Sequence, residues 1–205
     1  MTVEATAVVL VDPYNDFTSV WGRGWPLVRE VAKEVGLIGN LKRLLHSARE
    51  QGVEVVYAPH KRHRRNAETP RFPTPTQYLI PLIRFFSASG YGGRIREDLA
   101  PLPGEFVASE HPVTSGFGGT DLHAHLQSAG ITHLIVVGLL TNTCIESTVR
   151  HGVDLGYHVT VVDDAVAAWS HEDHAAGLSG SLPSVAHRMV STEEVIGSIS
   201  KGARS

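Results

Sequence analysis

The sequence predicts an α/β protein with a doubly wound, mostly parallel sheet that is flanked by helices in three layers. Short apolar segments rich in β-branched residues alternate with segments whose apolar residues recur at helical spacing. This alternation is typical of right-handed βαβ crossovers. The apolar segment at 133–138 contains Leu-Ile-Val-Val without polar alternation. It therefore indicates a parallel strand that is buried on both faces.

Six segments are expected to form the strands of this sheet. Each contains a short apolar run, and most are bounded by Gly, Pro or Asp, which end strands and form turns. In chain order the expected strands are 8–11, 53–58, 105–108, 133–138, 157–162 and 187–191. The first of them ends at Asp12 and therefore presents a carboxylate at its carboxyl end.

Helix signals fill the intervening segments. Gly36 and Gly39 are expected to divide a stretch of helical periodicity that ends at Gly52. Thr120 is expected to cap one helix and Thr192 to cap the terminal helix. In chain order the expected helices occupy 28–50, 122–128, 143–156, part of 171–178 and the residues from 192 onward.

We expect residues 1–205 to form a single domain, because this length is near the upper end for one compact core. Residues 59–104 are rich in Pro, Arg, Gly and His and have only a weak internal pattern. A connection of this length without structure is uncommon in a compact domain. Short helices are therefore expected there, in an irregular insert that shapes a ligand pocket.

The composition argues against several classes of protein. A net charge of −3 provides no basic stripe for nucleic acid and no polybasic patch for a membrane surface. No apolar run approaches the roughly 20 residues that span a bilayer, and the N-terminus lacks a signal-peptide pattern. A cytoplasmic protein is therefore expected. Its only cysteine, Cys144, excludes an intramolecular disulfide and a cysteine-based metal cluster.

Reactive side chains follow three of the expected strands. Asp12 ends the first strand, His111 follows the third, and Cys144 follows the fourth after a turn that begins at Gly138. Ligands bind at the carboxyl ends of strands in an open α/β sheet, and these three groups suit nucleophilic catalysis. The start of a helix at Cys144 would favour a thiolate. Alternatively, Cys144 is a core residue, Asp12 a turn residue and His111 a loop histidine.

Four motifs resemble those of the isochorismatase-like cysteine hydrolases, and they occur in the family's order. They are Val8-Val9-Leu10-Val11-Asp12-Pro13-Tyr14-Asn15-Asp16-Phe17, Ser115-Gly116-Phe117 with Thr120-Asp121-Leu122, residues 138–148, and Gly156-Tyr157-His158-Val159 with Asp164-Ala165. The resemblance covers roughly residues 6 to 198. It implies a doubly wound α/β sheet, an Asp-Lys-Cys triad, and hydrolysis of a small amide, lactam or ureido C–N bond through a thioester.

Matched motif by motif, the resemblance implies that Asp12 is the triad acid and Cys144 the nucleophile. It also implies an oxyanion hole formed by the backbone N–H groups of Leu140 and Cys144, with a non-proline cis bond between Leu139 and Leu140. The residues expected to contact substrate are Phe17, Trp21, Phe117, Leu139 and Thr141.

The chain departs from the family pattern at the triad lysine. His111 occupies this position, four residues before Ser115. A neighbouring Asp12 is expected to hold the imidazole and to favour its charged form, which gives a Cys-His-Asp triad. Two alternatives remain open. Either His111 is a bystander and Lys61 or Arg62 supplies the cation, or the protein has lost activity.

The residues after the second strand bear on metal and substrate. Nicotinamidases of the family bind a metal in this region, but here His60 and His63 have no accompanying Asp. We therefore expect no metal or other cofactor, and solvated histidines. The basic residues within 61–65 suit a carboxylate substrate or form a solvated loop, whereas Glu110 suits a cationic substrate. The sequence leaves the sign of the substrate charge open.

Two other functions on this fold also remain open. One is hydrolysis of a vinyl ether, as in the isochorismatases, which protonates a carbon and needs no thiol. The other is non-catalytic binding, which the missing lysine suggests. The expected partners are a small-molecule substrate and, as the family implies, a second copy of the chain in a homodimer or homotetramer. Trp21, Trp25 and Tyr91 are candidate interface residues.

Overall fold

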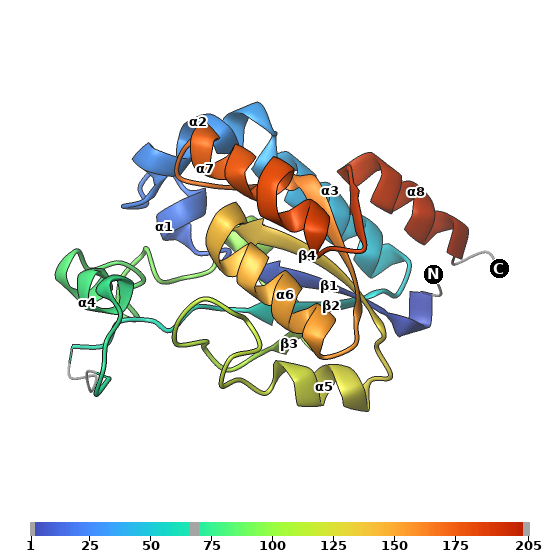
Figure 1. Cartoon of the computed structure of the whole chain (residues 1–205), viewed down its shortest axis with the longest axis horizontal. Helices are drawn as coiled ribbons and strands as arrows, with labels where there is room; N and C mark the ends of the chain where they lie inside the picture. Colours follow the sequence, from blue (N-terminus) through green and yellow to red (C-terminus); the bar gives the residue numbers. More distant parts are fainter. Residues whose placement is uncertain (1–2, 66–69, 203–205) are drawn as a thin grey trace.

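The computed structural model describes residues 3–65 and 70–202 and contains a six-stranded sheet (Figure 1). The strand order is β3-β2-β1-β4-β5-β6, and every neighbouring pair is parallel. The strands are β1 (Thr6–Val11), β2 (Glu54–Ala58), β3 (Phe106–Val107), β4 (His133–Leu139), β5 (His158–Ala167) and β6 (Arg188–Val190). The predicted doubly wound, parallel α/β fold is confirmed.

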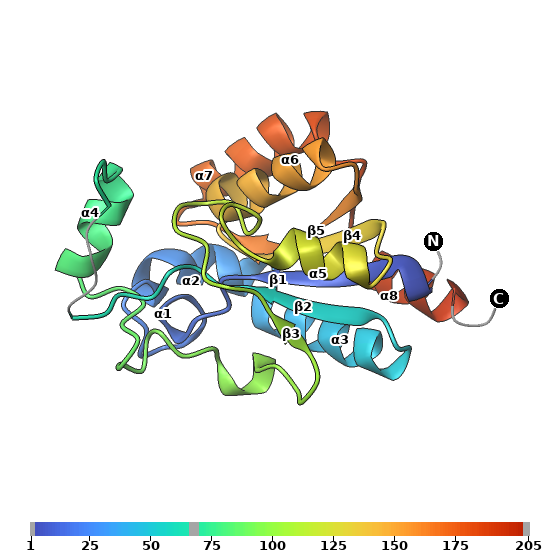
Figure 2. The same cartoon turned by 90° about the horizontal axis from the view of Figure 1, so that it is seen from below.

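Helices cover both faces of the sheet, which gives the three expected layers (Figure 2). One face carries α2 (Trp25–Glu34), α3 (Leu37–Glu50) and α8 (Thr192–Gly202). The other carries α5 (Leu122–Ser128) and α6 (Glu146–Asp154). The short helices are α1 (Asn15–Thr18), α4 (Pro75–Leu82) and α7 (His171–Ala175). Within the described residues, no helix combines the length and apolarity needed to cross a membrane.

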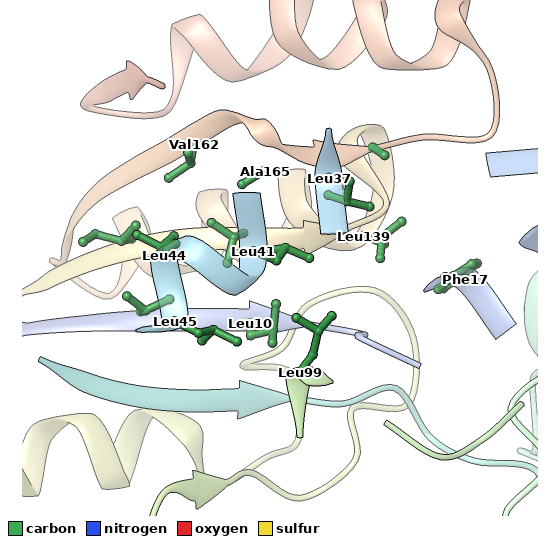
Figure 3. Packing of buried hydrophobic residues seen from close by; sticks show 14 of the residues in the cluster. Leu10, Phe17, Leu37, Leu41, Leu44, Leu45, Leu99, Leu139, Val162 and Ala165 are labelled. Atoms are coloured by element: carbon green, nitrogen blue, oxygen red, sulfur yellow. The ribbon is translucent and has the colours of Figure 1, made fainter. Parts of the chain in front are cut away.

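The central strand β1 contributes side chains to two separate cores because successive side chains of a strand point to opposite faces. Val8 and Leu10 pack in the core under α3, whereas Ala7, Val9 and Val11 pack in the core under α5 and α6. Figure 3 shows Leu10 among Leu41, Leu44 and Leu45, three leucines of α3. Complete burial of one such leucine contributes about 1.5–3 kcal/mol. These contacts fix the strand whose carboxyl end carries Asp12.

Several element boundaries differ from the sequence-based predictions, most of them by one to three residues. β5 continues to Ala167, beyond its predicted end at residue 162, and its pairing with β4 shifts register between Val136 and Gly138. The N-cap position of α5 is Asp121, while the Thr120 hydroxyl donates to the Gly116 carbonyl at 2.7 Å and accepts from the Leu122 N–H at 3.4 Å.

The terminal helix also begins differently from the prediction. The Ser191 hydroxyl accepts from the Glu194 N–H, and the Glu194 carboxylate accepts from the Ser191 N–H, so Ser191 rather than Thr192 caps α8. Gly36 does divide α2 from α3, with a φ of 68°.

The insert at 59–104 contains the expected short helical segments, α4 and a 3₁₀ turn at Glu97–Leu99. Thr74 and Gln77 form a capping box at the start of α4. Figures 1 and 2 show α4 projecting from the layered body, and no residue of this helix is buried. Three of its large apolar side chains and two that flank it are exposed, whereas Ile80 packs against the core: the exposed ones are Phe72, Tyr78, Leu79, Leu82 and Ile83.

Asp16 of α1 anchors the rest of the insert. This buried carboxylate accepts from the Arg23 N–H at 2.9 Å and from the Phe86 N–H at 2.7 Å. Gly92 approaches so closely that a Cβ atom at this position would lie 2.2 Å from the Asp16 carboxylate. Since a buried carboxylate requires such donors, Asp16 fixes residues 86 and 92 beside the exit of the central strand.

Candidate active site

The candidate site lies at the edge of the sheet where the order of the strands reverses. β2 and β3 lie on one side of β1, and β4 to β6 lie on the other, so the chain leaves β1 and β4 at a topological switch point. Gly138 permits the close approach of these two strands, because its φ is 116° and a Cβ there would lie 2.1 Å from the Val11 carbonyl oxygen. In open α/β sheets, this is the edge at which ligands bind.

Asp12, His111 and Cys144 meet at this switch point. One polar or sulfur atom from each residue lies within 4.8 Å of the other two. The His111 Nε2 is 3.0 Å from Asp12 Oδ1, and the side chains of these two residues are 0% and 1% exposed. Because an ionised carboxylate only accepts hydrogen bonds, Nε2–H donates to Asp12. The three side chains that the sequence placed at strand ends therefore come together.

An extension of the sheet beyond β2 and β3 holds His111 in place. The His111 N–H donates to the Pro59 carbonyl, and the His111 carbonyl accepts from the Lys61 N–H, both at 2.9 Å. Neither alternative cation takes the place beside Asp12: the Lys61 side chain is exposed, and Arg62 pairs with Glu110. The structure thus places His111, rather than Lys61 or Arg62, beside Asp12.

His60 is a site residue that the sequence interpretation missed. The prediction of a solvated loop histidine is wrong for this residue, which is 5% exposed and lies with its ring edge-on to His111, 5.0 Å between centroids. The Tyr14 hydroxyl donates to the His60 carbonyl at 2.7 Å. Burial lowers the pKa of His60 and so favours its neutral form. The position of His60 just after β2, at the same edge as Asp12, was the available signal.

Cys144 lies in a short π-helical turn (Thr141–Ile145) between β4 and α6. Burial, the charge of Asp12 and a hydrogen bond to Asp12 raise the pKa of the Cys144 thiol well above its ordinary value. Burial and the carboxylate of Asp12 therefore disfavour the thiolate. The predicted preference for a thiolate is wrong for this state, because desolvation and the neighbouring carboxylate outweigh the helix terminus.

The turn before Cys144 has the geometry that the resemblance implied. The Leu139–Leu140 peptide bond is cis. The Leu140 carbonyl accepts from the N–H groups of Thr143 and Ile145, both at 3.1 Å. The Leu140 N–H faces the thiol and acts to lower its pKa, against the larger effect of burial. A backbone donor is therefore present next to the sulfur atom.

Two side chains of α7 brace this turn. The Thr141 Oγ1 is 2.9 Å from the His174 Nδ1, and the Asn142 Nδ2 donates to Asp173 at 3.0 Å. These contacts connect the nucleophile turn to the segment after β5, which the sequence interpretation did not assign to the site.

The residues expected to contact substrate are dispersed. Leu139 and Thr141 are fully buried in the nucleophile turn, and Phe17 packs in an aromatic cluster of the core. Phe117 belongs to the core on the opposite face of the sheet, and Trp21 is 83% exposed. Their assignment to substrate remains a prediction.

A cavity of about 290 Å³ opens beside His111. It is lined by the two neighbours of that histidine, His60 and Pro112, and by residues of α4. We call it the basic cavity because four further lining residues are basic: Lys61, Arg62, His63 and Arg65.

The carboxylate of Glu110 does not neutralise the whole cavity. Glu110 accepts from Arg62 and Arg64, and although burial opposes the shift, these bonds lower the pKa of Glu110. Within the described ranges, Lys61 and Arg65 have no carboxylate partner. The cavity next to the triad is therefore positively charged.

Comparison with known proteins assigns the chain to a fold and a family of enzymes. A family model for the isochorismatase domain matches residues 6–193. Ureidoacrylate amidohydrolase RutB of Cronobacter sakazakii is 30% identical over 173 residues, which cover 79% of this chain and 74% of the relative.

Two solved structures extend this likeness. A cysteine hydrolase from Pseudomonas syringae pv. phaseolicola superposes with a TM-score of 0.85 and 26% identity, covering 98% of this chain and 95% of that one. N-carbamoylsarcosine amidase from Thermoplasma acidophilum has a TM-score of 0.68 and 25% identity, covering 94% and 98%.

The direction of the thiol shift predicts how Cys144 reacts with iodoacetamide. The midpoint of the alkylation rate in the free protein should lie above the ordinary thiol value of about 8.5. Asp12→Asn should move the midpoint down, because it removes a negative charge that disfavours the thiolate. The measurement is the midpoint rather than the absolute rate, since burial also limits access. A wild-type midpoint well below 8.5 would contradict this account.

Proposed function

Because the chain belongs to the isochorismatase family and is an amidohydrolase that acts on C–N bonds, we propose that it cleaves a small carboxylate-bearing amide or ureido compound through a thioester on Cys144. The observation that carries this proposal is the convergence of Cys144, Asp12 and His111, whose donor atoms lie within 4.8 Å of one another, with the buried Asp12 carboxylate held by His111. A base in contact with a nucleophile, itself oriented by a third group, is the arrangement of covalent catalysis.

Acylation begins with proton transfer from the thiol to Asp12. As the S–H bond breaks, the sulfur atom attacks the carbonyl carbon, and the backbone N–H groups of Leu140 and Cys144 stabilise the oxyanion. Asp12 then passes the proton to the leaving nitrogen as the C–N bond breaks. This route explains why a thiol with a raised pKa suits the site: the proton leaves only when the new bond forms.

Deacylation uses the same carboxylate in reverse. Asp12 takes a proton from the attacking water and returns it to the Cys144 sulfur when the thioester breaks. His111 remains hydrogen-bonded to Asp12 and orients it. In the described part of the chain, the buried His111 Nδ1 has no hydrogen-bond partner.

The basic cavity supports an anionic substrate. Lys61 and Arg65 line the cavity wall. Glu110 is already paired with two arginines, so its carboxylate attracts a cationic substrate only weakly. The name of the RutB relatives, ureidoacrylate amidohydrolase, denotes a ureido compound with a carboxylate. A vinyl ether hydrolase would not need the thiol, and the contact between Cys144 and Asp12 favours acyl transfer over that reaction.

Replacement of His111 tests the triad. His111→Ala should lower kcat about a hundredfold or more, the range typical of general acid–base groups, because Asp12 loses its buried donor. Cys144→Ser should abolish turnover. Both are measured with a panel of N-carbamoyl and ureido acids, and circular dichroism verifies the fold. Near-normal turnover of folded His111→Ala would rule out this role for the imidazole.

The substrate charge is tested at the cavity wall. Lys61→Ala and Arg65→Ala should each raise KM for a carboxylate substrate by about three- to tenfold, equivalent to roughly 0.7–1.4 kcal/mol, and leave kcat unchanged. The KM of the corresponding uncharged methyl ester should not change. Arg43→Ala on α3 removes an exposed cation far from the cavity and serves as the matched control. Equal effects on acid and ester would refute charge recognition.

We also propose that the chain forms a homodimer or homotetramer, and the exposed apolar side chains around α4 support this. Isolated chains rarely expose such a cluster on a projecting segment. Trp21 and Tyr91 are exposed as well, whereas Trp25 is partly buried against the core.

Light scattering should therefore give a mass above that of one 22.2 kDa chain. The double variant Tyr78→Asp with Leu82→Asp should shift the mass to the monomer. Leu102→Asp, which changes an exposed leucine outside α4, should not. A monomeric wild type at micromolar concentration would count against self-association.

A further inference from the structure

We propose that Asp12, His111 and Cys144 bind one divalent cation of borderline softness, with Zn²⁺ as the best fit, and that the bound ion blocks the hydrolase. The binding part does not depend on the proposed function, whereas the blocking part rests on it. This inference departs from the expectation that the protein has no metal site.

The donor set matches the preference of zinc. Zn²⁺ takes thiolate, imidazole and carboxylate ligands at about 2.0–2.3 Å, so tetrahedral ligands lie about 3.3–3.6 Å apart. His111 Nε2 and Asp12 Oδ1 are 3.0 Å apart, and all three donor atoms lie within 4.8 Å of one another. A movement of the Cys144 side chain by about 1 Å would complete the ligand geometry. Three protein ligands leave a fourth position for water or another ligand.

The identity of residue 111 decides whether the site accepts a cation. A lysine ammonium has no lone pair and carries a positive charge, so it would repel a metal ion. Histidine supplies a lone pair at one ring nitrogen and carries the proton on the other. A histidine in place of a lysine at this position therefore replaces a group that repels cations with one that can bind a metal ion.

The charges and protons balance when the ion binds. The Cys144 S–H bond breaks as the S–Zn bond forms, and the proton passes to solvent. The hydrogen of His111 moves from Nε2 to Nδ1, which is 0% exposed and has no partner in the described residues. Thiolate and carboxylate then neutralise the two positive charges of the ion, so the buried site gains no net charge.

Occupation of the site would stop the proposed reaction at its first step. The sulfur electron pair is bound to the metal, and Asp12 can no longer receive the thiol proton. Inhibition should therefore be reversed by a chelator. Cleavage of the amide by the free enzyme and its block by zinc are separate observations, so failure of the block can be distinguished from failure of the proposed function.

The experiment uses full-length protein that was prepared without a histidine tag and stripped with a chelator. Zn²⁺ is titrated against a chelating indicator, and Co²⁺ is titrated while the thiolate-to-cobalt charge-transfer band is recorded. We expect one ion per chain, a charge-transfer band, and release of about one proton per ion bound.

Variants locate the ion. Cys144→Ser should remove the band, and His111→Lys should weaken binding at least about tenfold, the lower range for the loss of a metal contact. His63→Ala, which removes a histidine of the basic cavity, is the matched control and should bind as the wild type does. If Cys144→Ser is unfolded, wild-type protein alkylated at Cys144 replaces it.

Two results would overturn the inference. One is binding without a charge-transfer band. The other is binding that His111→Lys and loss of the thiol leave unchanged, which would place the ion elsewhere, for example at the surface histidines 133, 158 and 187. Metal binding as expected, in a protein that cleaves no amide of the panel, would refute the proposed function and with it the block, and would leave the metal site standing. Amide cleavage that zinc does not inhibit would sink only the block.

Discussion

The carboxylate of Asp12, buried at the end of the central strand, is the constraint on which the site depends. A buried charge without a partner costs several kcal/mol. Here the hydrogen-bond donor that compensates the Asp12 charge is His111, which lies 99 positions later in the chain. The segment after β3 must therefore continue beside the segment after β2, and the bridge between His60 and His111 shows that it does. β3 has only two residues. The chain after it nevertheless continues alongside the segment after β2, and this pairing positions the His111 imidazole.

A second buried carboxylate lies four residues later and has a different task. Among residues 3–65 and 70–202, the Asp16 carboxylate accepts from the backbone N–H groups of Arg23 and Phe86 and from no side chain. The two acids thus divide the work at the exit of β1. One orders the insert that walls the site, and the other contacts the thiol. Both residues are aspartates, so it is their surroundings that give Asp16 a structural role and Asp12 a place beside the thiol.

Local sequence patterns were sufficient to predict the buried strands and the reactive residues that follow them. Apolar runs predicted β1 and β4, and the strand-end rule brought Asp12, His111 and Cys144 together. The length of β5 was missed because the apolar run ends at residue 162 and two aspartates follow, whereas the Asp164 carboxylate accepts from the distant Thr192. The direction of the thiol shift was missed for a similar reason. It depends on desolvation and on a carboxylate from another strand, which spacing along the chain does not reveal.

Cys144 is the only sulfhydryl group of the 205 residues, and this has a consequence for damage by peroxides. A sulfenic acid is usually rescued by a nearby cysteine that converts it to a disulfide. No such resolving residue exists here, so recovery depends on a thiol from outside, such as glutathione. Oxidants attack the thiolate, so a buried sulfur that keeps its proton is oxidised to the sulfenic acid more slowly. The chemistry that delays ionisation until substrate arrives would therefore also protect the enzyme between turnovers.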